Sequence, residues 1–154
     1  MKNLYCDIDN TVSNQFLRIK KKFSGNNMQT LLHNKKIILE DHLIQNSKFS
    51  LDAFSNKYKI NWLSARPTSL YKITEQWLQL KKLPINSIVL VNSHDEKIRY
   101  LKKNIVDLYI DDMKYDYFTF KPKLMTRYIA KIKKINIKYE IFNNNWKDLV
   151  KKYV

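Results

Sequence analysis

The chain has 154 residues, 44% of them hydrophobic, so it can fold around one core and is not an intrinsically disordered chain. One cysteine excludes an internal disulfide, and a single glycine excludes a P-loop and a Rossmann glycine fingerprint. The formal net charge is +15, from 29 basic and 14 acidic residues. Such a charge attracts polyanions or reflects a biased genome, and the sequence leaves both interpretations open.

The beginning of the chain lacks the apolar stretch of a signal peptide. No run approaches the ~18 apolar residues that a membrane-spanning helix needs. We therefore expect a cytoplasmic protein with no membrane partner and no disulfide-linked partner. The sequence does not indicate an oligomeric state.

Short apolar runs predict five β-strands, separated by helical patterns. The runs lie at residues 3–6, 60–63, 87–91, 107–110 and 138–142. Strands that alternate with helices are typical of a parallel sheet covered on both faces. We therefore predict an α/β protein with a doubly wound, mainly parallel five-stranded sheet, in a single domain that spans residues 1–154.

Three helices are predicted from the spacing of their apolar residues. The first ends at Leu83-Pro84, the second begins at a capping box of Ser93 and Glu96, and the third covers residues 145–153. Each offers one apolar face to the sheet. The predicted faces are Leu70, Ile73, Trp77 and Leu80, then Ile98, Leu101 and Ile105, then Trp146, Leu149 and Val150.

The segment between the first two strands, residues 12–52, is less regular. It contains a basic stretch at Lys20-Lys21-Lys22, a predicted turn at residues 24–27 and helical patterning at residues 28–45. We interpret it as a small helical cap insertion and the helix that connects it to the second strand.

Polar side chains gather where three of the predicted strands end. The carboxyl ends of parallel strands meet at one edge of a sheet, so these side chains are expected to lie close together. Carboxylates at one point repel each other unless a cation or a proton is shared between them. The residues are Asp7 and Asp9 after the first strand, Ser64 and Arg66 after the second, Asp111-Asp112 after the fourth, and Lys97 in the first turn of the preceding helix.

The chain resembles the haloacid dehalogenase (HAD) superfamily of phosphohydrolases, whose four motifs have counterparts here in the same order. These are Asp7-Ile8-Asp9-Asn10-Thr11, Ser64, Lys97 and Asp111-Asp112. The resemblance covers about residues 3–116. It implies a Rossmann-like HAD core, a phosphatase or phosphotransferase reaction, and Mg²⁺ as a cofactor held by oxygen ligands.

The resemblance also implies a role for each residue. Asp7 would be the nucleophile that forms an aspartyl-phosphate, and Asp9 would protonate the leaving oxygen and then deprotonate water. Lys97 would act with them by offsetting the charge of nucleophile and phosphate. The phosphate-binding set would be Thr11, which also shapes the loop, with Ser64, Lys97 and Arg66; the metal-binding set would be Asp7, Asp9 (through its main-chain carbonyl), Asp111 and Asp112.

Simpler interpretations of these residues stay open. Asp112 could be a helix N-cap, Ser64 a strand-end cap and Lys97 a solvated helix residue. Arg66 could grip a phosphate with its planar fork or lie on the surface. We interpret the aromatic run at residues 115–120 as core packing, with a base-stacking platform as the alternative.

Two features bear on the substrate. A cap of under fifty residues leaves a site open to a nucleotide or a nucleic-acid end, and the positive charge favours the same partners. Ser64-Ala65-Arg66-Pro67 and the helix with Thr74, Trp77 and Leu78 are also similar to the 3′-phosphatase domain of phage polynucleotide kinases. We therefore predict a Mg²⁺-dependent phosphatase that acts on a nucleotide or a nucleic-acid 3′-phosphate. The alternatives are a 5′-nucleotidase or small-metabolite phosphatase, and a non-catalytic nucleic-acid-binding module on the same fold.

Overall fold

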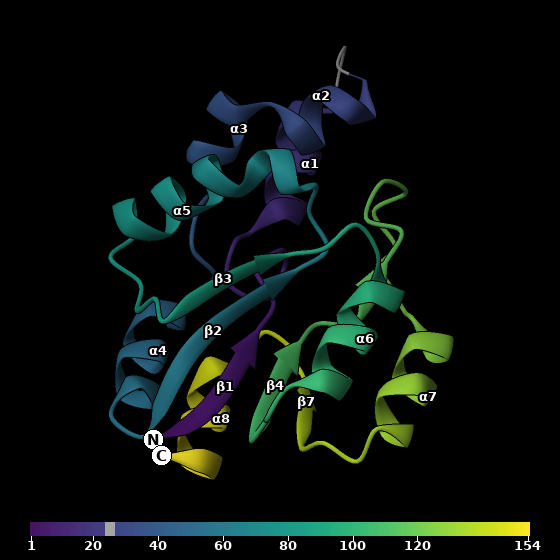
Figure 1. Cartoon of the computed structure of the whole chain (residues 1–154). Coiled ribbons are helices and arrows are strands. Elements are labelled where there is room, and N and C mark those ends of the chain that lie inside the picture. The colour runs from purple at the N-terminus through teal and green to yellow at the C-terminus, as the bar shows by residue number, and fades with distance from the viewer. Residues whose placement is uncertain (24–26) are drawn as a thin grey trace.

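A computed structural model of the chain, which describes residues 1–23 and 27–154, has a five-stranded sheet at its centre (Figure 1). Neighbouring strands in it are parallel, in the order β3-β2-β1-β4-β7. This confirms the predicted α/β, doubly wound, five-stranded fold. The strands are β1 (Lys2–Cys6), β2 (Tyr58–Ser64), β3 (Ser87–Leu90), β4 (Leu108–Asp111) and β7 (Tyr139–Ile141).

Side chains of the central strands alternate between two hydrophobic clusters, one on each face of the sheet. Leu4 and Cys6 of β1 belong to one cluster, and Tyr5 between them belongs to the other. In Figure 1, α4 lies on one side of the sheet, and α6 and α7 lie on the other. The first cluster is completed by α4 (Ser47–Ser55), α5 (Tyr71–Leu80) and α8 (Trp146–Tyr153), and the second by α6 (His94–Lys103) and α7 (Thr126–Lys134).

The segment between β1 and β2 is helical over much of its described length. Its first three helices lie beyond the carboxyl ends of the strands, at the top of Figure 1, where α3 packs against α5. In contrast, α4 packs against β2 and α8. The division of residues 12–52 into a cap and a connecting helix stays an interpretation, and residues 24–26 of the predicted turn lie outside the described residues. The three helices are α1 (Gln15–Lys22), α2 (Met28–His33) and α3 (Lys35–Leu39).

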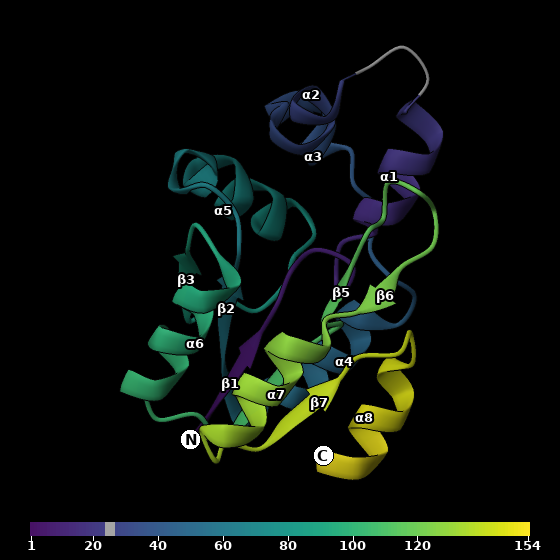
Figure 2. The same cartoon turned by 90° about the vertical axis from the view of Figure 1, so that its right-hand side faces the viewer.

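A hairpin that the sequence pattern did not indicate follows β4 and rises towards α1 (Figure 2). Phe120 in its loop packs against Phe16 and Phe23, with ring centroids 6.1 Å apart in both pairs. Tyr115 and Phe120 are 49% and 41% exposed, so the prediction that they are core residues is wrong. The hairpin consists of the antiparallel strands β5 (Lys114–Tyr115) and β6 (Lys123–Leu124); a single 3₁₀ turn, η1 (Thr68–Leu70), precedes α5.

Two residues that were predicted to be buried are exposed. Helix α6 ends at Lys103, so Ile105 lies in the following loop and is 78% exposed. Leu80 is the last residue of α5 and is 60% exposed, whereas Leu78 is fully buried. None of the helices that the structure describes has the length and apolar character needed to cross a membrane. The other predicted face residues are buried, or in one case partly buried: Leu70, Ile73, Trp77, Ile98, Leu101, Trp146, Leu149 and, partly, Val150.

Candidate active site

The carboxyl ends of β2, β1 and β4 meet at one edge of the sheet because β1 lies between the other two. A pocket of about 230 Å³ opens there. Its lining includes five of the residues singled out in the sequence at the strand ends and in α6: Asp7, Ser64, Lys97, Asp111 and Asp112. All five side chains are buried, so their polar groups are directed into this pocket or at each other.

Lys97 joins two of the acidic side chains. It lies in the first turn of α6, a helix capped by Ser93, whose hydroxyl oxygen accepts a hydrogen bond from the Glu96 amide at 3.2 Å. Its ammonium nitrogen is 2.6 Å from Asp7 Oδ1 and 2.9 Å from Asp111 Oδ2. Burial lowers the pKa of Lys97, but the two carboxylates raise it further, so Lys97 stays charged. At 1% exposure it is not a solvated helix residue.

Asp111 is held by several donors. Its Oδ1 accepts the Met113 amide at 2.7 Å, and its Oδ2 accepts Lys97 and the Tyr109 hydroxyl, which lies 2.9 Å from the hydroxyl of Tyr128. Burial raises the pKa of Asp111, but Lys97 and these hydrogen bonds outweigh it and hold the pKa below the usual range. The role of Tyr109 was missed, although side chains two residues apart on a strand lie on the same side.

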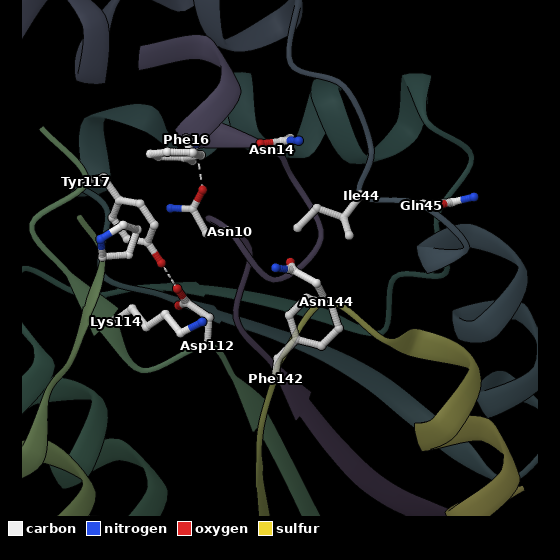
Figure 3. A pocket seen from close by; sticks show the side chains of 11 residues that line it. Asn10, Asn14, Phe16, Ile44, Gln45, Asp112, Lys114, Tyr117, Phe142 and Asn144 are labelled. Carbon is white, nitrogen blue, oxygen red and sulfur yellow. Dashed lines mark hydrogen bonds between the residues drawn. The ribbon is translucent and has the colours of Figure 1, made fainter. Parts of the chain in front are cut away.

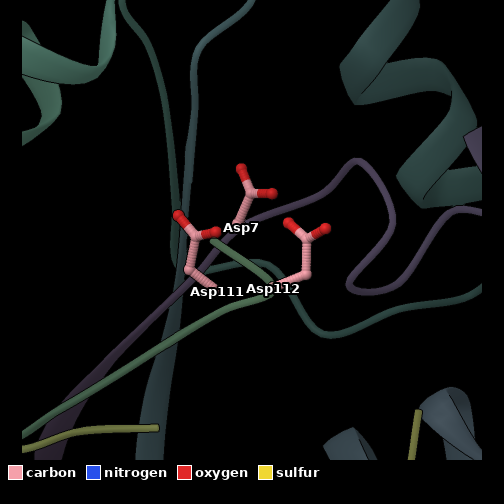
Figure 4. Close-up of side chains that lie close together, drawn as sticks. All are labelled: Asp7, Asp111 and Asp112. Atoms are coloured by element: carbon pink, nitrogen blue, oxygen red, sulfur yellow. The ribbon is translucent and has the colours of Figure 1, made fainter. Parts of the chain in front are cut away.

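Asp7 and Asp112 have raised pKa values. Burial raises the pKa of Asp7 to about 7, against the opposing charge of Lys97. Burial and the neighbouring charges of Asp111 and Asp7 raise the pKa of Asp112 to about 9. One oxygen from each of Asp7, Asp111 and Asp112 lies within 4.8 Å of the others (Figure 4). Three carboxylates at this spacing form a donor set that fits Mg²⁺, because it takes oxygen ligands and relieves their repulsion.

The carboxylate of Asp9 lies outside this metal-binding set and is held by Arg66. Arg66 Nε is 2.8 Å from Asp9 Oδ2 and Nη2 is 2.6 Å from Oδ1, while Nη1 donates to the Thr74 hydroxyl at 3.0 Å. Burial raises the pKa of Asp9, but Arg66 outweighs burial and lowers it. Arg66 is 5% exposed, so its interpretation as a surface residue is wrong. Its phosphate contact, and the metal contact of the Asp9 carbonyl, stay predictions.

A second buried ion pair lies between the cap helices and α5. Arg18 Nε of α1 is 3.2 Å from Asp41 Oδ1, and the main-chain oxygen of Asp41 accepts the indole N–H of Trp77 at 3.1 Å. Burial raises the pKa of Asp41 to about 6, against the charge of Arg18. The pair ties α1 to α5. Spacing could not have revealed it, because Arg18 and Asp41 belong to separate elements.

Thr11 connects the loop after β1 to the loop after β4. Its side chain is fully buried, and its hydroxyl oxygen accepts the Asp112 amide at 3.1 Å. Its main-chain oxygen accepts the indole N–H of Trp146 at 3.0 Å. Thr11 does not line the pocket, so its predicted part in shaping the loop matches these contacts, whereas its phosphate contact stays a prediction.

Comparison with known proteins gives partial matches. No protein-family profile matches the sequence. The chain is 32% identical over 80 residues to "Putative nucleotidase YqfW" of Bacillus subtilis strain 168, and 30% identical over 62 residues to "Putative nucleotidase BH1399" of Halalkalibacterium halodurans. These matches cover 51% and 40% of this chain, and 41% and 31% of the two relatives. The matched region therefore spans less than half the length of either relative.

Two solved structures are similar to nearly the whole chain. One is titled "Structure of Pnkp1/Rnl/Hen1 complex", with a TM-score of 0.57 and 18% identity, and the other "Structure of the Pnkp1/Rnl/Hen1 RNA repair complex", with a TM-score of 0.60 and 17% identity. Both cover 92% of this chain, and 46% and 42% of the matched chains. The chain thus shares its fold with part of each of them, while its membership of the HAD superfamily stays a prediction.

Proposed function

We propose that the chain is a Mg²⁺-dependent phosphatase that works through an aspartyl-phosphate, on a nucleotide or a nucleic-acid 3′-phosphate. One observation carries the proposal. A buried carboxylate, Asp7, lies at the centre of the pocket beside a buried cation, Lys97, and two further acids, Asp111 and Asp112. Folding alone does not require three buried acids around one lysine, and an isolated buried carboxylate is costly.

In the first step, an oxygen of the Asp7 carboxylate attacks phosphorus, and the bond from phosphorus to the leaving oxygen breaks. The proton that this oxygen needs comes from Asp9. In the second step, water attacks the phosphorus of the aspartyl-phosphate, its proton passes to Asp9, and phosphate leaves with Asp7 restored. Mg²⁺ bound by Asp7, Asp111 and Asp112 would neutralise charge on the phosphoryl oxygens.

The contact with Arg66 sets the proton state of Asp9. An ion pair favours the ionised carboxylate, which is the form that accepts a proton from water in the second step. The first step needs the protonated form. The negative charge of a bound phosphate opposes Arg66 and so raises the pKa of Asp9, which provides this form once substrate is present.

Three observations support a nucleotide or nucleic-acid substrate. Both curated relatives carry the name nucleotidase, and the structural neighbours belong to complexes named for RNA repair. The net charge of +15 attracts polyanions. The pocket itself is open to the hairpin side, where Lys114 and Tyr117 line it.

The test measures phosphate release from para-nitrophenyl phosphate, nucleoside monophosphates and a 3′-phosphorylated oligonucleotide, with and without Mg²⁺. Asp7→Asn is compared with wild type, and Asp52→Asn, an exposed acid paired with Lys48, is the matched control. We expect Mg²⁺-dependent release that Asp7→Asn abolishes and Asp52→Asn retains. Undiminished release by Asp7→Asn would overturn the nucleophile, and no release from any of the substrates would overturn the proposal.

A further inference from the structure

A second cavity, of about 410 Å³, adjoins the catalytic pocket on the hairpin side. Four residues line both of them: Asn10, Asp112, Lys114 and Tyr117. The two spaces therefore lie side by side, with Asp112 at their boundary. A molecule whose phosphate lies at Asp7 can extend into the second cavity without leaving the protein surface.

One wall of this cavity is aromatic and held in place. The rings of Phe16 and Tyr117 have centroids 5.8 Å apart at an interplanar angle of 57°, and Figure 3 shows both on the same side of the cavity. Asn10 accepts the main-chain N–H of Phe16 at 2.6 Å, and the Tyr117 hydroxyl donates to Asp112. Phe16 is only half-buried, so part of its ring remains available to a ligand.

The opposite side combines apolar and amide groups. Ile44 and Phe142 supply carbon surface, and Asn14, Gln45 and Asn144 supply side-chain amides (Figure 3). The Asn14 oxygen caps α1 by accepting the Leu17 amide at 2.9 Å, which leaves its NH₂ group for other partners. Within the described part of the chain, the structure shows no hydrogen bond to the side-chain amides of Gln45 and Asn144. Each amide presents both a donor and an acceptor.

We propose that this cavity binds the nucleobase of the substrate. A nucleobase has flat faces that stack on aromatic rings and an edge of donors and acceptors that matches side-chain amides. It is also joined to a phosphate by one sugar, as the adjoining pockets require. The inference rests on the proposed function, and it adds that the enzyme distinguishes nucleotides from base-free phosphate esters through residues outside the catalytic pocket.

The test measures binding, so that it does not depend on turnover. Asp7→Asn protein with Mg²⁺ is titrated calorimetrically with the four ribonucleoside 5′-monophosphates, the four 3′-monophosphates and ribose 5-phosphate. We expect at least one nucleotide to bind about ten-fold more tightly than ribose 5-phosphate, from stacking of its base. Adding Phe16→Ala should weaken that nucleotide about ten-fold and leave ribose 5-phosphate unchanged.

Two further variants keep the test specific. Phe23→Ala removes a neighbouring aromatic ring that packs on Phe120 but does not line the cavity, and it should leave both affinities unchanged. Asn144→Gly removes an exposed amide while allowing the positive φ of 55° at that residue, so it guards against a misfolded Phe16→Ala protein. It should weaken the nucleotide several-fold and leave ribose 5-phosphate unchanged.

The outcomes separate this inference from the proposed function. Equal affinity for all nucleotides and ribose 5-phosphate, or equal weakening of both ligand classes by Phe16→Ala and Asn144→Gly, would overturn the nucleobase site. If wild type hydrolyses para-nitrophenyl phosphate, such a result leaves the phosphatase standing. Base-dependent binding without hydrolysis of any ester would instead retain the nucleobase site and overturn the phosphatase.

Discussion

Arg66 grips both carboxylate oxygens of Asp9, at 2.8 and 2.6 Å, across the loops that follow β2 and β1. The two residues are 57 positions apart in the chain, and both belong to the edge where the proposed substrate binds. A bidentate pair fixes the direction of the carboxylate as well as its charge. Arg66 is therefore a positioning residue for Asp9 in the proposed reaction.

We predict that Arg66→Lys lowers kcat by about 10²-fold, the size of an acid–base contribution, with a smaller change in thermal stability. A lysine keeps the positive charge but loses the two-point grip, so the pKa of Asp9 rises. Because the second step needs ionised Asp9, the fall in rate at acidic pH should begin at a higher pH. The measurement is kcat against pH. Arg99→Lys, at a side chain 65% exposed, is the control, and an unshifted acidic limb in Arg66→Lys would contradict the role.

We predict that Lys97→Met destabilises the protein by about 3–5 kcal/mol at neutral pH, because it leaves buried carboxylates without their cation. Without Lys97, the pKa values of Asp7 and Asp111 in the folded state rise further above their unfolded values. A raised carboxyl pKa favours the folded state when the group is protonated, so the loss should be smaller at pH about 5 than at pH about 8. Urea unfolding at both pH values measures it.

The exposed Lys103, at the end of the same helix, provides the control for that substitution. Lys103→Met should change the free energy of unfolding by less than about 0.5 kcal/mol at either pH. Equal destabilisation by Lys97→Met at both pH values would show that lost packing, and not the unpaired acids, causes the effect.

We predict that Mg²⁺ binds more tightly as pH rises from about 6 to about 9, with release of protons. The pKa of Asp7 is about 7 and that of Asp112 about 9 in the metal-free protein, and both must be ionised to hold a cation. Calorimetry in two buffers of different ionisation enthalpy measures the affinity and the protons released. Asp112→Asn should weaken binding, and the exposed Asp95→Asn should not. An affinity that does not change with pH would contradict this assignment.

We predict that salt separates the two substrate classes. For a 3′-phosphorylated oligonucleotide, kcat/KM should fall steeply between about 50 and 200 mM salt, because a strand makes several phosphate contacts. A nucleoside monophosphate makes few and should show a shallow fall. Equal slopes for both would indicate that the charge of +15 does not take part in substrate binding and reflects composition alone.

The sequence by itself determined the sheet and the candidate site residues at its edge. Alternating apolar runs specify strands, intervening helices force parallel pairing, and parallel pairing brings the residues after each strand to one edge. Asp7, Ser64 and Asp111 could therefore be placed together before any contact was known. Lys97 followed from the same geometry, since a helix after a parallel strand begins at that edge.

Other features were decided only by the tertiary structure. The partner of Arg66, the Tyr109–Tyr128 pair behind Asp111 and the cavity beside Phe16 depend on side chains from elements whose separation in the chain carries no periodic signal. The aromatic run at residues 115–120 shows the limit clearly. Its composition suits a core, but it forms a short hairpin whose packing surface is another loop region, so part of it stays exposed. Local patterns report which side of an element is buried, whereas contacts between distant elements depend on how the finished layers pack.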